Sequence, residues 1–503
     1  MFSGLVFAAL SGFLAATAFP KIEWPFMAWI ALIPLLGVLA RRSGPKAGLL
    51  GWIAGSVFYG ILLYWIPAVP SHYAGMSLVL SVGIYLLLVV LLGTSWALFG
   101  LTFAFIHRRR PAAAFLAAPF LWVGIEYLLT HVLTGFPWGL LGLSQYRNLA
   151  LIQVAAVTGI YGVSFILVLF QSLFVLSMRA SRRLPFAAAL VIMALAHIGG
   201  ALSLGRVAPT GRSFPAAVIQ GNVSSEVYWQ QTGADEILSL FEAHMDLTRR
   251  ASDEGARLVV WPEFTVPLCF SCDDPLSRSF KEILSRFVEE TGTTLLVGSN
   301  ETSGPAAARI YYNSSLCLNP GRPVTAYAKS HLVPFGEYTP YKKILGFVEK
   351  VSHAIGELTP GPGPSLHAFR DLKFGTPICY ELIFPDLVRR FTKAGADFLV
   401  TITNDGWYGR SSAPYQHFAQ AVFRAVENRR FVLRAATTGI SGVVDPYGRI
   451  LVQSELGVRT FLRETITPRS GLTAYARWGD VFAGLCLTIG GLLFIMACFT
   501  RRP

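Results

Sequence analysis

Three residues whose side chains can do covalent chemistry stand in separate segments of the second half of the chain: Glu263, Lys329 and Cys379. A cysteine thiolate attacks carbonyl carbon well, but it needs a base to take the thiol proton and a positive neighbour. Glu263 is a candidate for the base, and Lys329 for stabilising the negative charge that develops. A backbone N–H close to Cys379, such as that of Tyr380, can complete an oxyanion hole. These residue types predict nucleophilic catalysis at a carbonyl group.

The local sequence around each candidate supports this hypothesis. Glu263 comes just beyond a buried strand predicted over 258–261, and Lys329 begins a loop rich in proline and glycine. Cys379 lies at a predicted strand-to-helix turn. A single buried cysteine is usually structural, and a single glutamate or lysine is usually a solvated charge. The prediction therefore depends on the three residues together.

The elements that must position these residues follow an alternating pattern. Runs rich in β-branched residues predict strands, and segments of helical periodicity predict helices between them. The predicted strands are 216–220, 258–261, 294–298, 398–402 and 431–434, and the predicted helices are 237–252, 280–291 and 415–428. A hairpin-like turn at 445–448 lies between strands at 440–444 and 450–452. Apolar strands alternating with helices indicate an α/β sheet covered by helices.

The composition divides the chain into parts. Its 503 residues have a mean hydropathy of +0.51, and only 14% are charged, against about 25% in soluble domains. Only two acidic residues, Glu23 and Glu126, precede Gly205, whereas acidic residues are frequent beyond it. We therefore predict a membrane bundle over 1–204, a globular domain over 205–478, and a final membrane helix with a short tail over 479–503.

Eight apolar runs are candidates for membrane spans, which need about 20 residues. They lie near 3–20, 24–40, 48–68, 75–106, 112–132, 150–177, 184–203 and 479–499. The run at 75–106 is long enough for two spans, but Gly83 and Gly93 make no polar turn, so one long or tilted helix is predicted. The first run lacks a basic segment and is followed at once by another run. We therefore expect it to be a span and not a cleaved signal peptide.

Clusters of basic residues predict the orientation of these spans. They lie after the second, fourth, sixth and eighth spans, and they are Arg41, Arg42, Lys46, Arg108, Arg109, Arg110, Arg179, Arg182, Arg183, Arg501 and Arg502. The positive-inside rule makes these segments cytoplasmic. Both termini are then cytoplasmic, and the globular domain is extracytoplasmic. The net charge of +13 fits this topology better than nucleic-acid binding, so no nucleic-acid partner is predicted.

Several features leave alternatives open. Glu126 lies inside the fifth span, where a carboxylate is either functional or hydrogen-bonded among helices. The aromatic loop 135–146 is either an interfacial belt or part of a lipid-binding face. Cys269 and Cys272 are either a disulfide, if the domain is extracytoplasmic, or two ordinary thiols. The loop 340–364 is either a lid or an ordinary surface loop. No metal or cofactor is predicted, and a monomer is the default.

Glu263, Lys329 and Cys379, in this order and each in its own motif, resemble the Glu-Lys-Cys triad of the nitrilase superfamily. Its carbon–nitrogen hydrolases share an α-β-β-α sandwich. Longer segments resemble the apolipoprotein N-acyltransferase family of bacterial membrane enzymes. These segments are 220–222 with Trp229, 261–263, 329–337, 379–381, 404–409 and 427–430, with 136–138 and 144–145 in the membrane part. The resemblance covers nearly the whole chain and implies eight spans with the domain before the last one.

The resemblance implies a reaction in the bacterial inner membrane, with the domain in the periplasm. Cys379 would attack the sn-1 ester of a phospholipid, typically phosphatidylethanolamine, and form a thioester as the lysophospholipid leaves. The N-terminal amine of an S-diacylglyceryl-cysteine on an apolipoprotein would then take the acyl chain. By the same resemblance Glu263 is the general base, Lys329 supports the oxyanion, and Glu337 orients the site.

Further residues are expected around the nucleophile. Trp229, Tyr380 and Glu381 match positions that the family uses there. An acyl-enzyme must outlive attack by water, so its pocket should be apolar and shielded. Aromatic side chains such as Trp229, Trp407 and Tyr408 are candidates for this shielding.

The chain departs from the family pattern at two places. Ala436 and Thr437 stand where the family often has Thr-Asn, which puts in doubt any hydrogen bond assigned there. Leu129 stands where an arginine near Glu126 is expected, so a Glu–Arg pair cannot be carried over.

The sequence is also compatible with two other functions. One is a membrane-tethered amidase or nitrilase that hydrolyses a small substrate with the same triad. Its acceptor would be water, whereas the acyltransferase uses a lipidated amine. The other is a transporter or scaffold with a degenerate nitrilase domain, and the presence of all three triad residues argues against it.

Overall fold

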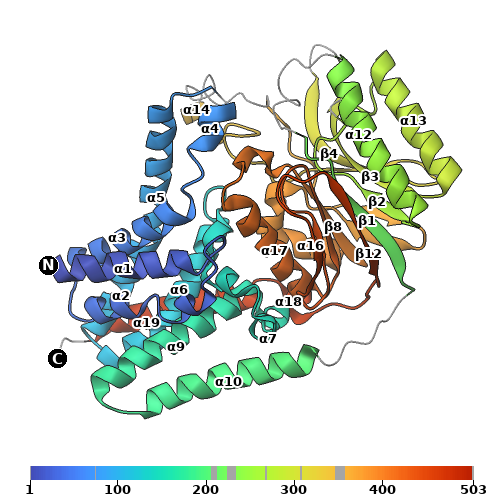
Figure 1. Ribbon diagram of the computed structural model, residues 1–503. Helices are drawn as coiled ribbons and strands as arrows, with labels where there is room; N and C mark the ends of the chain where they lie inside the picture. The colour runs from blue at the N-terminus through green and yellow to red at the C-terminus, as the bar shows by residue number, and fades with distance from the viewer. Residues whose placement is uncertain are drawn as a thin grey trace. The chain divides into compact units, whose positions relative to one another are not determined.

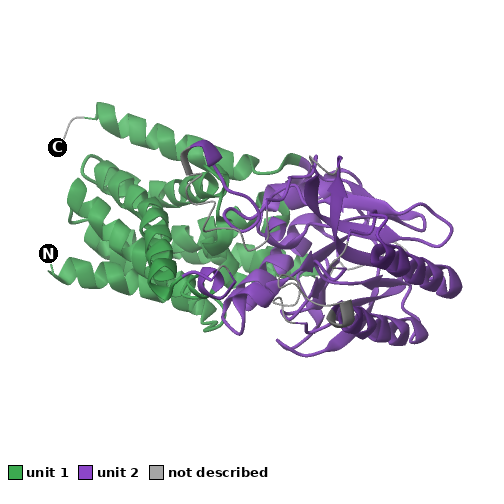
Figure 2. Ribbon diagram, turned by 90° about the horizontal axis from the view of Figure 1, so that it is seen from above, with its two compact units in different colours: residues 1–68, 77–207, 478–503 green, residues 69–76, 208–477 purple. Residues whose placement is uncertain are grey.

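The computed structural model describes residues 2–73, 75–204, 212–223, 234–266, 269–305, 309–345 and 357–500. The chain divides into two compact units (Figures 1 and 2). The first unit comprises residues 1–68, 77–207 and 478–503, and the second comprises residues 69–76 and 208–477. The first unit is helical, and the second is an α/β structure.

The first unit consists of apolar helices. They are α1 (Phe2–Thr17), α2 (Ile33–Leu39), α3 (Pro45–Leu62), α5 (Leu78–His107), α6 (Pro111–His131), α7 (Leu149–Ile152), α8 (Ala155–Thr158), α9 (Ile160–Ala180), α10 (Leu184–Leu204) and α19 (Val481–Phe499). Within the described residues, five are long and apolar enough to cross a membrane: α5, α6, α9, α10 and α19. The run predicted as one long helix at 75–106 does form one helix, α5, through Gly83 and Gly93.

Two of the predicted spans are interrupted. The run at 24–40 forms a 3-10 helix, η1 (Pro25–Trp29), and then α2. Buried amides satisfy the backbone at this break: Gln171 Oε1 accepts from the Leu32 N–H at 2.6 Å, and Gln171 Nε2 donates to Ala28 O at 3.1 Å. The run at 150–177 breaks at Gly159, whose φ of +67° separates α8 from α9.

Glu126 of α6 holds a loop inside the first unit. Its Oε1 accepts from the Trp122 indole at 3.0 Å and from the Leu141 N–H at 2.7 Å. Residue 141 belongs to η3 (Leu141–Gln145), which follows η2 (Pro137–Gly139). Both of these hydrogen-bond donors to Glu126 are neutral groups. The family pattern places an arginine near this carboxyl group, but the residue at that position in this chain is Leu129. Trp138 is only 1% exposed, so it cannot belong to an interfacial aromatic belt.

The second unit contains two six-stranded sheets. The strands are β1 (Phe214–Gln220), β2 (Leu258–Val260), β3 (Thr294–Ser303), β4 (Ile310–Leu318), β5 (Thr325–Ala328), β6 (Leu366–Phe369), β7 (Leu372–Gly375), β8 (Phe398–Thr403), β9 (Val432–Ala436), β10 (Gly442–Val444), β11 (Ile450–Gln453) and β12 (Thr460–Ile466). The first sheet has the order β12-β1-β2-β3-β4-β5, and the second has the order β11-β10-β9-β8-β7-β6. Strands β1, β2 and β3 are parallel, as are β7, β8 and β9.

The two sheets face each other and are covered by helices on their outer sides (Figure 1). Helices α12 (Ala234–Asp253) and α13 (Pro275–Thr291) pack on the first sheet, and α16 (Pro385–Lys393) and α17 (Ala413–Asn428) pack on the second. Between the sheets, Phe214 of β1 lies 4.5 Å from Phe369 and 5.6 Å from Phe398, measured between ring centroids. These four layers form the α-β-β-α sandwich that the resemblance to the nitrilase superfamily implies.

The predicted strands and helices of the globular part are all present, within a few residues of their predicted ends. The hairpin around 445–448 is confirmed, because β10 and β11 pair antiparallel across it. No strand is predicted at β4, β5, β6, β7 or β12, and no helix is predicted at α14 (Lys342–Leu345), α16 or α18 (Ala474–Trp478). Four of these strands have only four residues or carry charged side chains on an exposed face, so their periodicity is weak.

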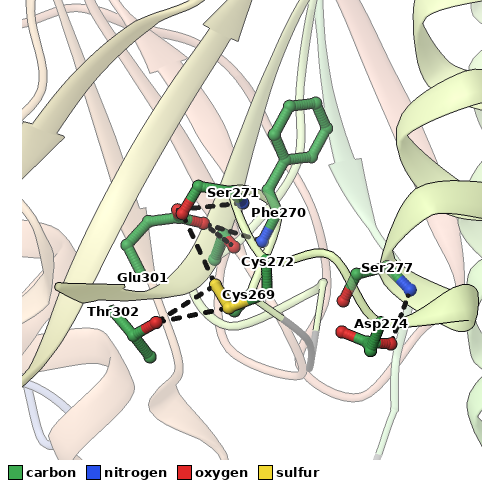
Figure 3. Close-up of a disulfide and its surroundings, with 9 residues drawn as sticks. Cys269, Phe270, Ser271, Cys272, Asp274, Ser277, Glu301 and Thr302 are labelled. Atoms are coloured by element: carbon green, nitrogen blue, oxygen red, sulfur yellow. Dashed lines mark hydrogen bonds between the residues drawn. A yellow bond between two sulfur atoms is a disulfide. The ribbon is translucent and has the colours of Figure 1, made fainter. Parts of the chain in front are cut away.

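Cys269 and Cys272 form a disulfide beside β3 (Figure 3). The carboxylate of Glu301 accepts from the N–H of Phe270 at 2.9 Å and from the N–H of Ser271 at 3.2 Å. Thr302 Oγ1 lies 3.4 Å and 3.2 Å from the two sulfur atoms. Of the two alternatives that the sequence left open, the structure has the disulfide.

Candidate active site

The nucleophile candidate, Cys379, begins a short 3-10 helix, η6 (Cys379–Ile383). Ile378 forms an isolated parallel bridge with Ile402 of β8, so the chain leaves the sheet and turns at the next residue. Cys379 has a φ of +51°, in the left-handed region that a non-glycine residue rarely adopts. Such a conformation costs on the order of 1–3 kcal/mol and clusters at active sites. This is the strand-to-helix turn that the sequence predicts.

Glu263, Lys329 and Glu337 converge in one buried cluster. Lys329 Nζ lies 2.8 Å from Glu337 Oε1 and 3.4 Å from Glu263 Oε1. Asn313 Nδ2 donates to the same two carboxylates, at 2.7 Å to Glu263 and 3.0 Å to Glu337. The second oxygen of Glu263 accepts from the Asn404 N–H at 2.8 Å. Glu263, Lys329 and Glu337 are each at most 3% exposed, so solvent screens their charges little.

Local structure explains how these side chains meet. Glu263 follows β2, and the turn that carries it lies directly against Gly298 of β3. Lys329 follows β5, and its N–H donates to the carbonyl of Asn313 on β4 at 2.8 Å. Glu337 is held by the Val333 N–H, which donates to its Oε2 at 2.8 Å. The cluster is therefore fixed by backbone hydrogen bonds from several elements of the second unit.

The charges in this cluster favour different protonation states. Burial raises the pKa of Glu263, and the nearby Lys329 only partly opposes this. Burial disfavours the charge of Lys329, but Glu337 and Glu263 outweigh it and raise the pKa of the ammonium group. Lys329 therefore stays protonated, and Glu263 has a higher proton affinity than a solvated carboxylate.

The thiol of Cys379 interacts with the same charges. Burial raises its pKa, Glu263 raises it further, and Lys329 opposes both. The resting group is therefore a neutral thiol at physiological pH, and it needs a base to become a nucleophile. The cluster contains such a base in Glu263 and a cation in Lys329.

Glu381 joins the nucleophile turn to the segment after Lys329. One carboxylate oxygen accepts from the Ile378 N–H at 2.8 Å. The other accepts from the Tyr327 hydroxyl at 2.7 Å, and from the N–H groups of Ser330 at 2.7 Å and His331 at 3.0 Å. This buried carboxylate thus holds two of the segments that carry the predicted triad.

The predicted aromatic residues have different surroundings. Tyr380 is buried in η6, with its ring 5.2 Å from that of Phe384. Trp407 lies in η7 (Asp405–Tyr408), half-buried, and its ring is 4.6 Å from that of Tyr73. The pKa of Tyr408 is raised first by burial and then by the charge of Cys379. Trp229 lies outside the described residues, as does part of the loop 340–364.

Sequence reasoning missed Asn313 and the partners of Thr437. Asn313 is a fully buried polar residue in the middle of β4, and a strand that was not predicted could not draw attention to it. Thr437 Oγ1 donates to Asn404 Oδ1 at 2.8 Å. The threonine at this departure from the family pattern therefore makes a hydrogen bond next to the Glu263 contact.

Comparisons with known proteins agree with this architecture. Residues 216–470 match the model of the carbon–nitrogen hydrolase family, which defines the class of the domain. Residues 11–173 match the apolipoprotein N-acyltransferase N-terminal domain. Apolipoprotein N-acyltransferase of Geobacter metallireducens is 38% identical over 98% of this chain and 95% of its own length. That of Chlorobaculum tepidum is 30% identical over 98% and 96%.

Among solved structures, Saccharomyces cerevisiae Nit3, of the nitrilase superfamily, aligns with a TM-score of 0.40 and 22% identity. The alignment covers 52% of this chain and 92% of the Nit3 chain. Because this similarity is low, the assignment rests on the family models and the full-length relatives. The chain belongs to the apolipoprotein N-acyltransferase family, a family of bacterial membrane acyltransferases.

Proposed function

We propose that this chain transfers an acyl chain from the sn-1 position of a phospholipid, such as phosphatidylethanolamine, to a lipoprotein. The acceptor is the N-terminal amine of an S-diacylglyceryl-cysteine. The observation that carries the proposal is the buried Glu263–Lys329–Glu337 cluster, whose charges act on the Cys379 thiol. It rests equally on membership of the acyltransferase family.

The first half of the reaction forms a thioester. Glu263 takes the proton of Cys379, and the sulfur attacks the sn-1 carbonyl carbon. Lys329 and a backbone N–H, that of Tyr380, stabilise the oxyanion. Glu263 then returns the proton to the sn-1 oxygen, and the lysophospholipid leaves. The proton is only moved within the site, so the net charge of the buried cluster does not change when the thiolate forms.

The second half discharges the thioester. The neutral N-terminal amine attacks the thioester carbonyl, Glu263 takes a proton from the nitrogen, and the Cys379 sulfur leaves and regains that proton. Glu337 keeps Lys329 in place through the 2.8 Å ion pair. Glu381 holds the nucleophile turn, and Tyr380, Trp407 and Tyr408 shield the thioester from water.

Both substrates are lipid-anchored, which gives the membrane unit its purpose. We propose eight spans, with both termini in the cytoplasm and the globular domain, residues 205–478, in the periplasm. The inner membrane is the site of the reaction, and the enzyme is a monomer. The basic clusters between the apolar runs support this orientation, as does the disulfide, because disulfides persist in oxidising compartments.

Intact mass measurement of the purified protein tests the covalent step. With phosphatidylethanolamine and no acceptor, we expect one added acyl group on the wild type and none on Cys379→Ala. A diacylated peptide should then remove the adduct and appear as the triacylated product. An adduct that persists in Cys379→Ala would overturn the mechanism. Release of free fatty acid alone would identify a hydrolase instead.

A further inference from the structure

A second buried charge cluster contacts the backbone of the nucleophile turn. It consists of Asp405, His417 and Arg434, each at most 1% exposed. None of them belongs to the Glu263–Lys329–Glu337 cluster. Arg434 Nη2 donates to Asp405 Oδ2 at 2.7 Å. His417 Nδ1 lies 2.9 Å from Asp405 Oδ1 and 3.1 Å from Arg434 Nη2. Charged groups are rarely placed fully inside a domain without a partner or a task.

The other nitrogen of the imidazole contacts the nucleophile directly. His417 Nε2 lies 3.1 Å from the carbonyl oxygen of Cys379. A carbonyl oxygen only accepts hydrogen bonds, so this contact places a proton on Nε2. The contact is with the backbone of Cys379, and the side chain of the same residue carries the proposed chemistry.

The contacted carbonyl belongs to the same peptide group as the N–H of Tyr380. A trans peptide is planar, and its C=O and N–H point in opposite directions. Fixing the carbonyl toward His417 therefore fixes the Tyr380 N–H on the opposite side. A hydrogen bond to a peptide carbonyl also polarises the group and makes its N–H a stronger donor.

The two partners of His417 place opposite demands on its Nδ1. Asp405 Oδ1 only accepts hydrogen bonds and favours a proton there, whereas Arg434 only donates and favours a lone pair. Burial lowers the pKa of His417, Arg434 lowers it further, and Asp405 opposes them. A ring with its proton on Nε2 alone accepts from Arg434 at Nδ1, and a ring protonated on both nitrogens donates to Asp405 there. In both states Nε2 carries the proton that Cys379 needs. Burial works against the charge of Asp405, but Arg434 and His417 hold its pKa at about 2. Asp405 stays ionised and keeps Arg434 in place.

We propose that His417 is a positioning residue for the oxyanion hole. Its Nε2–H holds the carbonyl of Cys379, and through the shared peptide plane it aims and polarises the N–H of Tyr380 toward the oxyanion. The left-handed φ of Cys379 makes this support necessary, because that conformation is unfavourable in isolation. The proposal rests on the proposed acylation of Cys379.

Two substitutions at one position separate this role from simple packing. The amide nitrogen of His417→Gln reaches the place of Nε2 and keeps the donor, whereas that of His417→Asn falls short. Single-turnover acylation should fall about 10–100-fold in His417→Asn, below the cost of deleting an oxyanion donor outright, and recover to within about fivefold of wild type in His417→Gln. The KM for phospholipid should stay within about threefold in both, because substrate binding is not involved.

His367 supplies the matched control. It is also a fully buried histidine of the second unit, and it bonds Ser315 and Thr325 at 2.9 Å each. His367→Asn should lower the melting temperature without changing the acylation rate of the folded fraction. If His417→Asn and His417→Gln lose activity equally and in proportion to their loss of stability, His417 is a packing residue and the proposal fails.

Nuclear magnetic resonance observes the peptide group itself. Cys379-Tyr380 is the one Cys-Tyr pair in the sequence, so labelling cysteine carbonyls with ¹³C and tyrosine nitrogens with ¹⁵N selects this peptide. The Tyr380 amide signal should shift in His417→Asn and return toward the wild-type position in His417→Gln. Identical signals in all three proteins would overturn the proposal, whatever their activity.

A measurement on wild-type protein, with His417→Gln used only to assign the signal, covers the case in which His417→Asn does not fold. With ¹⁵N-labelled histidine, the signal lost in His417→Gln identifies His417, and its shifts report the tautomer. The proposal requires the proton on Nε2, and a bare Nε2 would contradict it. Failure of the proposed function is distinguished from this, because it would appear as a missing acyl adduct on wild-type Cys379.

Discussion

At the residue scale, the active-site candidates show how burial sets chemistry. The pKa of the Cys379 thiol is raised by burial and by Glu263, so the resting nucleophile is neutral. Glu263 also has a raised pKa, so it takes a proton more readily than a solvated carboxylate does. In the proposed mechanism, the buried cation of Lys329 then stabilises the thiolate and the oxyanion that follows it. The Cys379 thiol is therefore expected to keep its proton until a substrate carbonyl is bound.

Glu263→Gln separates the two effects of this carboxylate. Without a base, acylation by phosphatidylethanolamine should slow by roughly 10²–10⁴-fold. At the same time the thiol should ionise more easily, because a neighbouring negative charge that raises its pKa is gone. The rate at which iodoacetamide alkylates Cys379 can be measured by mass spectrometry over a range of pH. The pH dependence of this rate should therefore shift to lower pH.

Glu290→Gln is the control for this experiment, since Glu290 lies exposed on α13 and should affect neither measurement. A near-normal acylation rate in Glu263→Gln would assign the base to another residue. An alkylation profile shifted to higher pH would contradict the charge interaction between Glu263 and the thiol.

At the element scale, close backbone contacts set the position of the base. A Cβ atom at Gly298 of β3 would lie 2.5 Å from the carbonyl oxygen of Pro262 and 2.7 Å from the Cα of Glu263. Real Cβ atoms do not approach backbone so closely, so strand β3 needs glycine at this position. Because of this contact, any displacement of β3 at Gly298 would also move Glu263.

Gly298→Ala should therefore displace the turn that carries Glu263. We expect a loss of stability of about 1–3 kcal/mol from overpacking. Acylation should fall at least tenfold per folded molecule, because displacements of about 1 Å at a catalytic group can cost about 10²-fold. Thermal unfolding and the intact-mass assay measure the two effects.

Gly491→Ala is the control, because apart from its chain neighbours and the backbone of its own helix no atom of the described structure lies within 4 Å of a Cβ at this position of α19. This substitution should leave the melting temperature and the acylation rate close to wild type. A Gly298→Ala protein that is destabilised but acylates at the normal rate would show that Glu263 tolerates the shift.

At the scale of the whole molecule, the Cys269–Cys272 disulfide reports the compartment of the second unit. The other four cysteines, Cys317, Cys379, Cys486 and Cys498, are free thiols. When cells are quenched in acid and the protein is alkylated under denaturing conditions, four thiols should react before reduction and six after it. Gel shift with a maleimide polymer counts them.

A Cys269→Ser/Cys272→Ser double variant is the reference for this count, with four reactive thiols in both conditions. Six reactive thiols in wild-type protein before reduction would argue against an oxidising compartment, and with it against the periplasmic placement of residues 205–478.

The amino-acid sequence by itself determined the division into an apolar and a globular part, and it predicted the three residues around which the candidate site is built. Both follow from local properties: hydropathy over about 20 residues, the alternation of strands and helices, and short motifs around Glu263, Lys329 and Cys379. It also predicted Glu337 and Glu381 as supporting residues, but only by resemblance. The structure adds their contacts, to Lys329 and to the segments on both sides of the nucleophile.

Only the tertiary structure decided which polar residues meet. Asn313 joins Glu263 and Glu337 from a strand that the sequence did not predict, and His417 contacts Cys379 across a separation of 38 residues. The disulfide and the breaks at η1 and Gly159 are likewise decided by contacts and backbone angles that no local pattern contains. Hydropathy and periodicity describe which face of an element is buried, whereas hydrogen bonds between distant residues depend on how the sheets pack.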